Sequence, residues 1–127
     1  MTPSMYERVR NLFVDAALTD GRIIQLLFFE DTKKATDAFI VFRPNGGGAV
    51  RTDLGGEYYV GVDVIGPKDK RAATAQAAQR IVDYVQANPM ADDCVGYIQN
   101  MGAIPSPVLT EEGRIVFRLQ FAITYGE

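Results

Sequence analysis

Three pairs of adjacent carboxylates are the residues of this sequence best suited to acid–base chemistry: Glu30-Asp31, Asp92-Asp93 and Glu111-Glu112. Two carboxyls act as acid and base when they face one pocket and their environments drive the two pKa values apart. Adjacent acidic residues in polar turns are usually solvated instead. We therefore interpret all three pairs as surface groups.

The run Gly46-Gly47-Gly48 is the one stretch that suggests a phosphate-binding loop. A Walker loop needs a Lys-Ser/Thr pair after its glycines and a helix whose N-terminus meets the phosphate. Here the glycines lead into Ala49-Val50-Arg51 and then into a predicted strand. We interpret the run as part of a loop and not as a nucleotide site.

The absence of histidine excludes several classes of enzyme. Zinc sites of the usual nitrogen and sulfur type lack ligands, since Cys94 is the single cysteine. A Ser-His-Asp or Cys-His nucleophile cannot be built in one chain without histidine. We therefore expect no histidine-dependent hydrolase activity and no metal-dependent activity, and we interpret Cys94 as a small packed hydrophobe.

Two further charged features have structural explanations. Asp63 lies within a strongly apolar strand, where it is expected to point outward on an open sheet face or to pair with Arg118. Lys68, Lys70 and Arg71 form a small basic patch, which is typical of a solvated helix end.

Length and composition are those of one soluble domain spanning residues 1–127, with 47% hydrophobic and 23% charged residues. The net charge of −3 leaves no basic surface that would make nucleic acid a primary ligand. The longest apolar runs, 23–29 and 38–42, are too short to cross a membrane. Residues 1–10 resemble no secretory signal, and a lone cysteine suits a reducing compartment, so we expect folding in a cytoplasm.

The last stretch, residues 113–125, organises the rest of the chain. Six large apolar residues occupy alternate positions: Ile115, Phe117, Leu119, Phe121, Ile123 and Tyr125. The intervening residues are smaller or polar: Val116, Arg118, Gln120, Ala122 and Thr124. Period two places these two sets on opposite faces of a strand. The pattern predicts that Phe117, Leu119 and Phe121 lie in the core, beneath covering helices.

A first helix is predicted over residues 4–18. Ser4 and Glu7 have the spacing of a capping box, in which each side chain accepts a hydrogen bond from a free backbone N–H. Gly21 is expected to end the helix, because glycine readily adopts the left-handed conformation.

A second helix is predicted from Asp69, as N-cap, to about Ala87. Its packed stripe is Ala77, Ala78, Ile81, Val82 and Val85. Thr74 lies on the same stripe, where its hydroxyl can bond back to the helix backbone.

Strands are predicted at 38–43, 58–65, 95–104 and 113–125, with a short strand or extended segment at 22–30. A helix remains the alternative for 22–30, because periodicity cannot decide so short a run. Residues 45–57 hold five of the twelve glycines and are expected to form a mobile loop.

These elements predict an α+β fold: a mostly antiparallel sheet of four to five strands with two helices packed on one face. The second face of the sheet is then partly open, which is also how a subunit interface looks. Arg118 and Gln120 on that face are candidate interface residues.

Four stretches together resemble the tail terminator proteins of long-tailed bacteriophages, the family that includes the minor tail protein U of lambda-like phages. They are Phe-Ile-Val-Phe-Arg-Pro-Asn-Gly-Gly at 39–47, Asp-Leu-Gly-Gly-Glu-Tyr-Tyr-Val at 53–60, Tyr-Ile-Gln-Asn-Met-Gly at 97–102, and the strand at 116–125 that ends in Ile-Thr-Tyr. The order of elements agrees over nearly the whole chain. The nearer likeness is to short prophage-encoded tail proteins.

The resemblance implies a structural virion protein without enzymatic activity or cofactor. Such a subunit assembles as a homo-hexameric ring on the tail tube, ends tail polymerisation, and offers its other face to the head-completion protein. Its location would be the virion tail, after assembly in the bacterial host cytoplasm. The resemblance also implies that the glycine-rich loop orders against a neighbouring subunit or the tube, with Val50, Arg51, Asp53 and Leu54 as candidate contacts.

Two other functions stay open at this point. A small α+β ligand-binding or regulatory domain would use the open sheet face as its site. An enzyme would have to rely on carboxylate, lysine, tyrosine or backbone groups alone.

Overall fold

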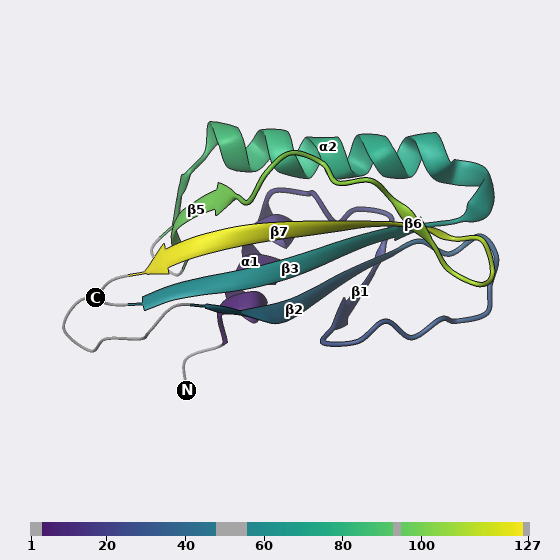
Figure 1. The fold of residues 1–127 in the computed structure, drawn as a ribbon, viewed down its shortest axis with the longest axis horizontal. Coiled ribbons are helices and arrows are strands. Elements are labelled where there is room, and N and C mark those ends of the chain that lie inside the picture. The colour runs from purple at the N-terminus through teal and green to yellow at the C-terminus, as the bar shows by residue number, and fades with distance from the viewer. Residues whose placement is uncertain (1–3, 48–55, 93–94, 126–127) are drawn as a thin grey trace.

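A computed structural model describes residues 4–47, 56–92 and 95–125 of the chain. Its elements, in chain order, are α1 (Met5–Asp15), β1 (Ile23–Leu26), β2 (Phe39–Gly47), β3 (Gly56–Gly66), a 3-10 turn (Lys68–Lys70), α2 (Arg71–Ala87), β4 (Met90–Asp92), β5 (Gly96–Asn100), β6 (Val108–Leu109) and β7 (Ile115–Tyr125). The strands form one sheet in the order β1-β2-β3-β7-β5-β4, and β6 also pairs with β7 (Figure 1). The predicted α+β class is confirmed.

Strand β7 lies near the middle of this sheet and confirms the predicted alternation. It pairs antiparallel with β3 along its whole length, from Gly66 opposite Ile115 to Gly56 opposite Tyr125. Its large apolar residues join one cluster with the buried faces of α1 and α2, and Phe117, Leu119 and Phe121 are all buried there. Both helices therefore cover the same face, as predicted.

Helix α1 starts and ends differently from the prediction. Ser4 is the N-cap, but its side chain makes no capping hydrogen bond, so the prediction of a capping box is wrong. The helix ends at Asp15, and Ala17 is left-handed just after it, with φ of 59°. Gly21 is also left-handed, as expected, with φ of 78°, but it does not end the helix. The N–H of Leu18 donates to the Phe13 carbonyl, which completes a Schellman motif with alanine in the glycine position.

Helix α2 begins one residue later than an N-cap at Asp69 predicts. Residues Lys68–Lys70 form the 3-10 turn, and Lys70 stands at the N-cap with no side-chain bond, so the prediction of Asp69 as N-cap is wrong. The predicted packed stripe is correct, with Ala78, Ile81, Val82 and Val85 buried. The hydroxyl of Thr74 donates to the Lys70 carbonyl at 2.8 Å, as predicted.

The end of β3 approaches α2 so closely that only glycine fits at position 66. A Cβ on Gly66 would lie 1.7 Å from the Thr74 hydroxyl oxygen and 2.8 Å from the Thr74 Cβ. Thr74 is itself fully buried and hydrogen-bonded, so it cannot move aside.

We therefore expect Gly66→Ala to lower the free energy of unfolding by about 1–3 kcal/mol, the usual cost of overpacking a core. Urea denaturation measures this loss. Thr74→Ala in the same chain should recover part of it, because that change removes the nearest atom. Unchanged stability of Gly66→Ala would show that the helix and strand are not in this contact.

The sheet is larger than the four to five strands predicted. Strand β1 is a true strand, shorter than 22–30, and it runs parallel to β2. The short strands β4 and β6 were not predicted, and β5 ends at Asn100. Strands β5 and β7 pair antiparallel, as predicted for the last two long strands of the chain.

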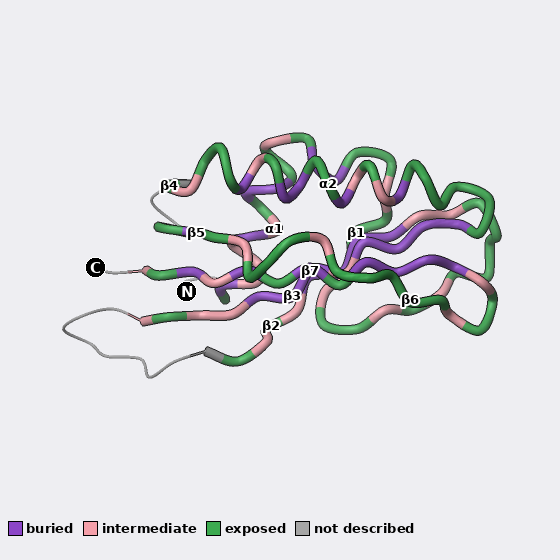
Figure 2. Tube along the Cα trace, turned by 45° about the horizontal axis from the view of Figure 1, so that its top comes forward, coloured by how far each residue is buried: buried purple, intermediate pink, exposed green. Residues whose placement is uncertain are grey.

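The second face of the sheet is half covered. At one end, four apolar residues are buried in a second cluster: Phe39, Val41, Ile65 and Val116. Phe29, from the segment after β1, packs on this cluster. The ring of Phe29 meets that of Phe39 edge-on at 4.9 Å. In Figure 2 the central strands are accordingly buried over this half of the molecule and more exposed toward the other. The face that was predicted to be partly open is therefore open only over this second, more exposed half.

Candidate interaction surface

The uncovered half of the helix-free face, called here the open face, is polar. Its residues come from β3, β5 and β7: Tyr59, Asp63, Tyr97, Gln99, Arg118, Gln120 and Thr124. Neighbouring strands in register bring these side chains onto one surface. The nearby Glu57 carboxylate, which accepts a hydrogen bond from the Tyr59 phenol, raises the pKa of Tyr59.

Asp63 points onto this face, as predicted, but its ion-pair partner is Arg43. The guanidinium of Arg43 donates to both carboxylate oxygens of Asp63 at 3.2 Å. It can do so because it crosses Gly61, where a Cβ would lie 2.8 Å from the guanidinium carbon. Arg118 lies directly opposite Asp63 in the register, yet makes no ion pair with any residue that the structure describes.

Arg118 and Gln120, the two predicted interface residues on β7, are both exposed and lie together. They border a hollow of about 200 Å³ between β7 and the segment after β5. At its rim the Asn100 amide donates to the Val82 carbonyl at 3.2 Å, while the buried Asn100 Oδ1 accepts no hydrogen bond from the described residues. The open face thus presents the side-chain donors of Arg118 and Gln120 to an incoming partner, whereas Asn100 pairs with Phe121 in the register and lies on the helix-covered side of the sheet.

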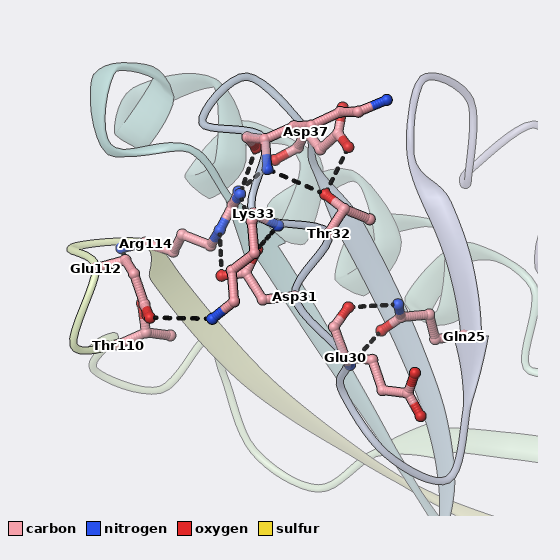
Figure 3. Close-up of polar contacts among 10 residues, drawn as sticks. Gln25, Glu30, Asp31, Thr32, Lys33, Asp37, Thr110, Glu112 and Arg114 are labelled. Atoms are coloured by element: carbon pink, nitrogen blue, oxygen red, sulfur yellow. Dashed lines mark hydrogen bonds and ion pairs between the residues drawn. The ribbon is translucent and has the colours of Figure 1, made fainter.

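The dominant polar contact of the fold is one that sequence reasoning missed. Arg114, only 4% exposed, lies at the start of β7 and reaches the loop between β1 and β2 (Figure 3). Its guanidinium donates to both carboxylate oxygens of Asp31, at 3.1 and 3.2 Å, and to the carbonyls of Lys34 and Asp37. The same group lies 4.9 Å from the centre of the Phe39 ring. Arg114 therefore holds this loop over the second cluster.

Asp31 is accordingly a structural carboxylate. The Lys33 backbone N–H that donates to it, followed by the Arg114 guanidinium, lowers the pKa of Asp31. Across the same loop Lys33 makes an exposed ion pair with Glu112 at 3.8 Å. Among the described residues no three acidic or cysteine side chains gather to hold a metal. The interpretation as a surface group is therefore wrong for Asp31, which is largely buried against Arg114, and correct for Glu30, Glu111 and Glu112, which are exposed.

The remaining predicted residues divide into two groups. Lys68, Lys70 and Arg71 are exposed at the start of α2, as a solvated helix end requires. Others lie outside the residues that the structure describes: Val50, Arg51, Asp53, Leu54, Asp93 and Cys94. No helix in the described part of the chain is long and apolar enough to span a membrane.

Comparison with known proteins gives one informative match. No curated protein sequence matches the chain. One solved structure, whose title names no function, covers 95% of this chain and 96% of its own, with 13% identity and a TM-score of 0.47. That likeness is too distant to carry an argument. The family model described as phage tail termination protein, in contrast, matches residues 2–127, and the chain therefore belongs to this family of structural bacteriophage tail proteins.

Proposed function

We propose that this tail terminator acts as a single domain, residues 1–127, that forms a homo-hexameric ring on the end of the tail tube. The ring ends polymerisation of the tube protein and presents its other face to the head-completion protein. Assembly takes place in the cytoplasm of a bacterial host that carries the phage as a prophage, and involves no catalysis and no cofactor. The family match carries the termination role, and the ring is the form that we infer for it.

The open face supports an assembly surface of this kind. Arg118 and Gln120 are exposed side by side, and Arg118 has no ion-pair partner in the described part of its own chain. Charged and polar groups of this kind give an interface its register and its discrimination between partners. An arginine is also among the residue types enriched at interfaces. We place the contact with a neighbouring subunit or the tube protein here.

A second contact region is proposed in the segment that joins β2 to β3. Val50, Arg51, Asp53 and Leu54 combine apolar and charged groups suited to a partner's surface. The strands on either side of this segment pair with each other. We propose that these four residues contact a neighbouring subunit or the tail tube.

The test is complementation of a terminator-deficient phage with variants, followed by measurement of tail lengths by electron microscopy. Arg118→Glu combined with Gln120→Glu should leave the fold stable, since exposed changes usually alter stability by less than about 0.5 kcal/mol. Tails should become abnormally long. Replacing residues 50–54 with glycine and serine should do the same. The control, Arg80→Glu on the exposed side of α2, makes the same arginine-to-glutamate change as Arg118→Glu but lies away from both regions. Normal tails from both variants would contradict the proposed contacts.

A further inference from the structure

The sheet has two unpaired edges. Strands β1 and β4 end the order β1-β2-β3-β7-β5-β4, and no second strand from the described residues pairs with either. An edge strand presents backbone N–H and C=O groups that can pair with another chain. Because the two edges lie at opposite ends of one sheet, a single chain carries both halves of a head-to-tail contact.

The backbone of β1 shows which of its groups face outward. The N–H groups of Ile23 and Leu27 donate to carbonyl oxygens of β2 and its preceding residue, both at 2.8 Å. Successive residues of a strand direct their backbone groups to opposite sides, so the N–H groups of Ile24 and Leu26 point away from β2. Neither donates to another backbone group of the described residues. These are the donors that a neighbouring strand would engage.

The β1 edge lacks the residues that usually keep an edge strand from pairing with another chain. Residues 23–28 contain neither proline nor lysine, and Ile23, Ile24, Leu27 and Phe28 are all exposed. Natural edge strands are normally blunted by such residues, because an exposed apolar edge invites association. Phe28 is the extreme case, with 76% of its surface exposed.

The turn that carries Phe28 is held firmly in this exposed position. The Gln25 side chain donates to the Glu30 carbonyl at 2.8 Å and accepts from the Glu30 N–H at 3.1 Å (Figure 3). Between these two residues, whose paired hydrogen bonds are called here the Gln25–Glu30 bracket, Leu27 has a φ of 74°, which is rare for a bulky residue. The Phe28 N–H donates to the Leu26 carbonyl. A pre-organised aromatic group of this kind is typical of an interface anchor.

The opposite edge offers a matching surface. Met90, at the start of β4, is 75% exposed, and Tyr97 on the adjacent β5 is also exposed. Methionine sulfur and aromatic rings make favourable contacts. We propose that β1 of one copy pairs with β4 of the next copy, so that the sheet continues across subunits with Phe28 and Met90 in the seam. A head-to-tail contact of this kind generates either a closed ring or an open helix.

This inference rests on the proposed ring, and disulfide cross-linking can test the two separately. Ile24→Cys and Met90→Cys are combined with Cys94→Ser, which removes the native thiol. The protein is oxidised alone at high concentration and with the tail tube protein of its own phage, while native mass spectrometry follows assembly. We expect a ladder of cross-linked copies. A control with Arg80→Cys in place of Ile24→Cys should give none, because Arg80 lies on the exposed side of α2.

A second variant tests the strand pairing itself. Ile24→Pro removes an outward N–H and leaves the bonds between β1 and β2 intact, so folding should persist while association weakens about tenfold, the effect of losing about 1.4 kcal/mol. Ile23→Pro is the matched control, since it deletes the bond to β2 and should lower stability instead. Assembly without the cross-link, or assembly unaffected by Ile24→Pro, would overturn the edge pairing and leave the ring intact. Failure of the unchanged chain to assemble under both conditions would overturn the ring and the pairing together.

Discussion

Replacing Arg114 with alanine is expected to lower the free energy of unfolding by roughly 3–5 kcal/mol, the range found when one partner of a buried ion pair is removed. The change leaves the Asp31 carboxylate without its cation and the carbonyls of Lys34 and Asp37 without their donor. It also releases the loop that carries Phe29 over the second cluster. Chemical denaturation followed by circular dichroism measures the loss.

Two further variants separate charge from geometry at this site. Arg114→Lys keeps the positive charge but cannot donate to four acceptors in one plane, so its stability should fall between those of the parent and Arg114→Ala. Glu112→Ala removes the exposed ion pair with Lys33 and should change stability by less than about 1 kcal/mol. Equal effects of Arg114→Ala and Glu112→Ala would mean that the buried cluster does not stabilise the fold.

Replacing Phe121 with alanine is expected to cost roughly 3–5 kcal/mol, as large-to-small changes in a packed core do. The side chain is fully buried in the cluster between the sheet and the helices. Its ring meets that of Phe13 on α1 edge-on at 5.7 Å, and Phe13 in turn meets Phe42 on β2 at 5.8 Å. The cavity would therefore open at the point where α1 joins the sheet.

The neighbouring residue supplies a matched control for this prediction. Gln120 lies on the opposite face of the same strand and is exposed, so Gln120→Ala should change stability by about 0.5 kcal/mol or less. Melting curves of the two variants compare the two faces of β7 directly. A melting temperature of Phe121→Ala equal to that of the parent would contradict the assignment of faces.

Two of the surfaces proposed for assembly, the open face and the β1 edge, are held in place by different contacts. The open face depends on the long β3–β7 pairing, which holds Arg118 and Gln120 in register. The β1 edge depends instead on local contacts, the Gln25–Glu30 bracket and the Arg22 guanidinium, which donates to the Ile65 carbonyl at 2.9 Å. We therefore expect mild destabilisation of β1 to affect the edge before it affects the open face.

The sequence by itself determined the faces of the long elements. Alternation in β7 and the stripe on α2 predicted the buried residues correctly, because a period of two or 3.6 residues is imposed by the backbone geometry of each element. Residue types alone also excluded the usual nitrogen and sulfur zinc sites and the Ser-His-Asp and Cys-His nucleophiles, because the chain contains no histidine. The family resemblance, carried by short stretches along the chain, was confirmed by the family match.

Local signals near element ends were less reliable. Ser4 and Glu7 have the spacing of a capping box but form none, and the helix ends at Asp15, with Ala17 left-handed, before the chain reaches Gly21. A single capping bond contributes only about 1 kcal/mol, so the packing of Phe13 and its neighbours decides where the helix stops. The packing of the core therefore determines where helices end and loops begin.

Only the tertiary structure decided the partners of the charged residues and the pairing of the short strands. Arg114 and Asp31 are 83 residues apart, and nothing in the spacing of either predicts the other. Asp63 was expected to point outward or to pair with Arg118; it does point outward, but the missing side chain at Gly61 lets Arg43 pair with it instead. The parallel pairing of β1 with β2, and with it the exposed edge, depends on the path of the chain from Leu27 to Ala38. Such contacts follow from three-dimensional proximity, which local periodicity does not encode.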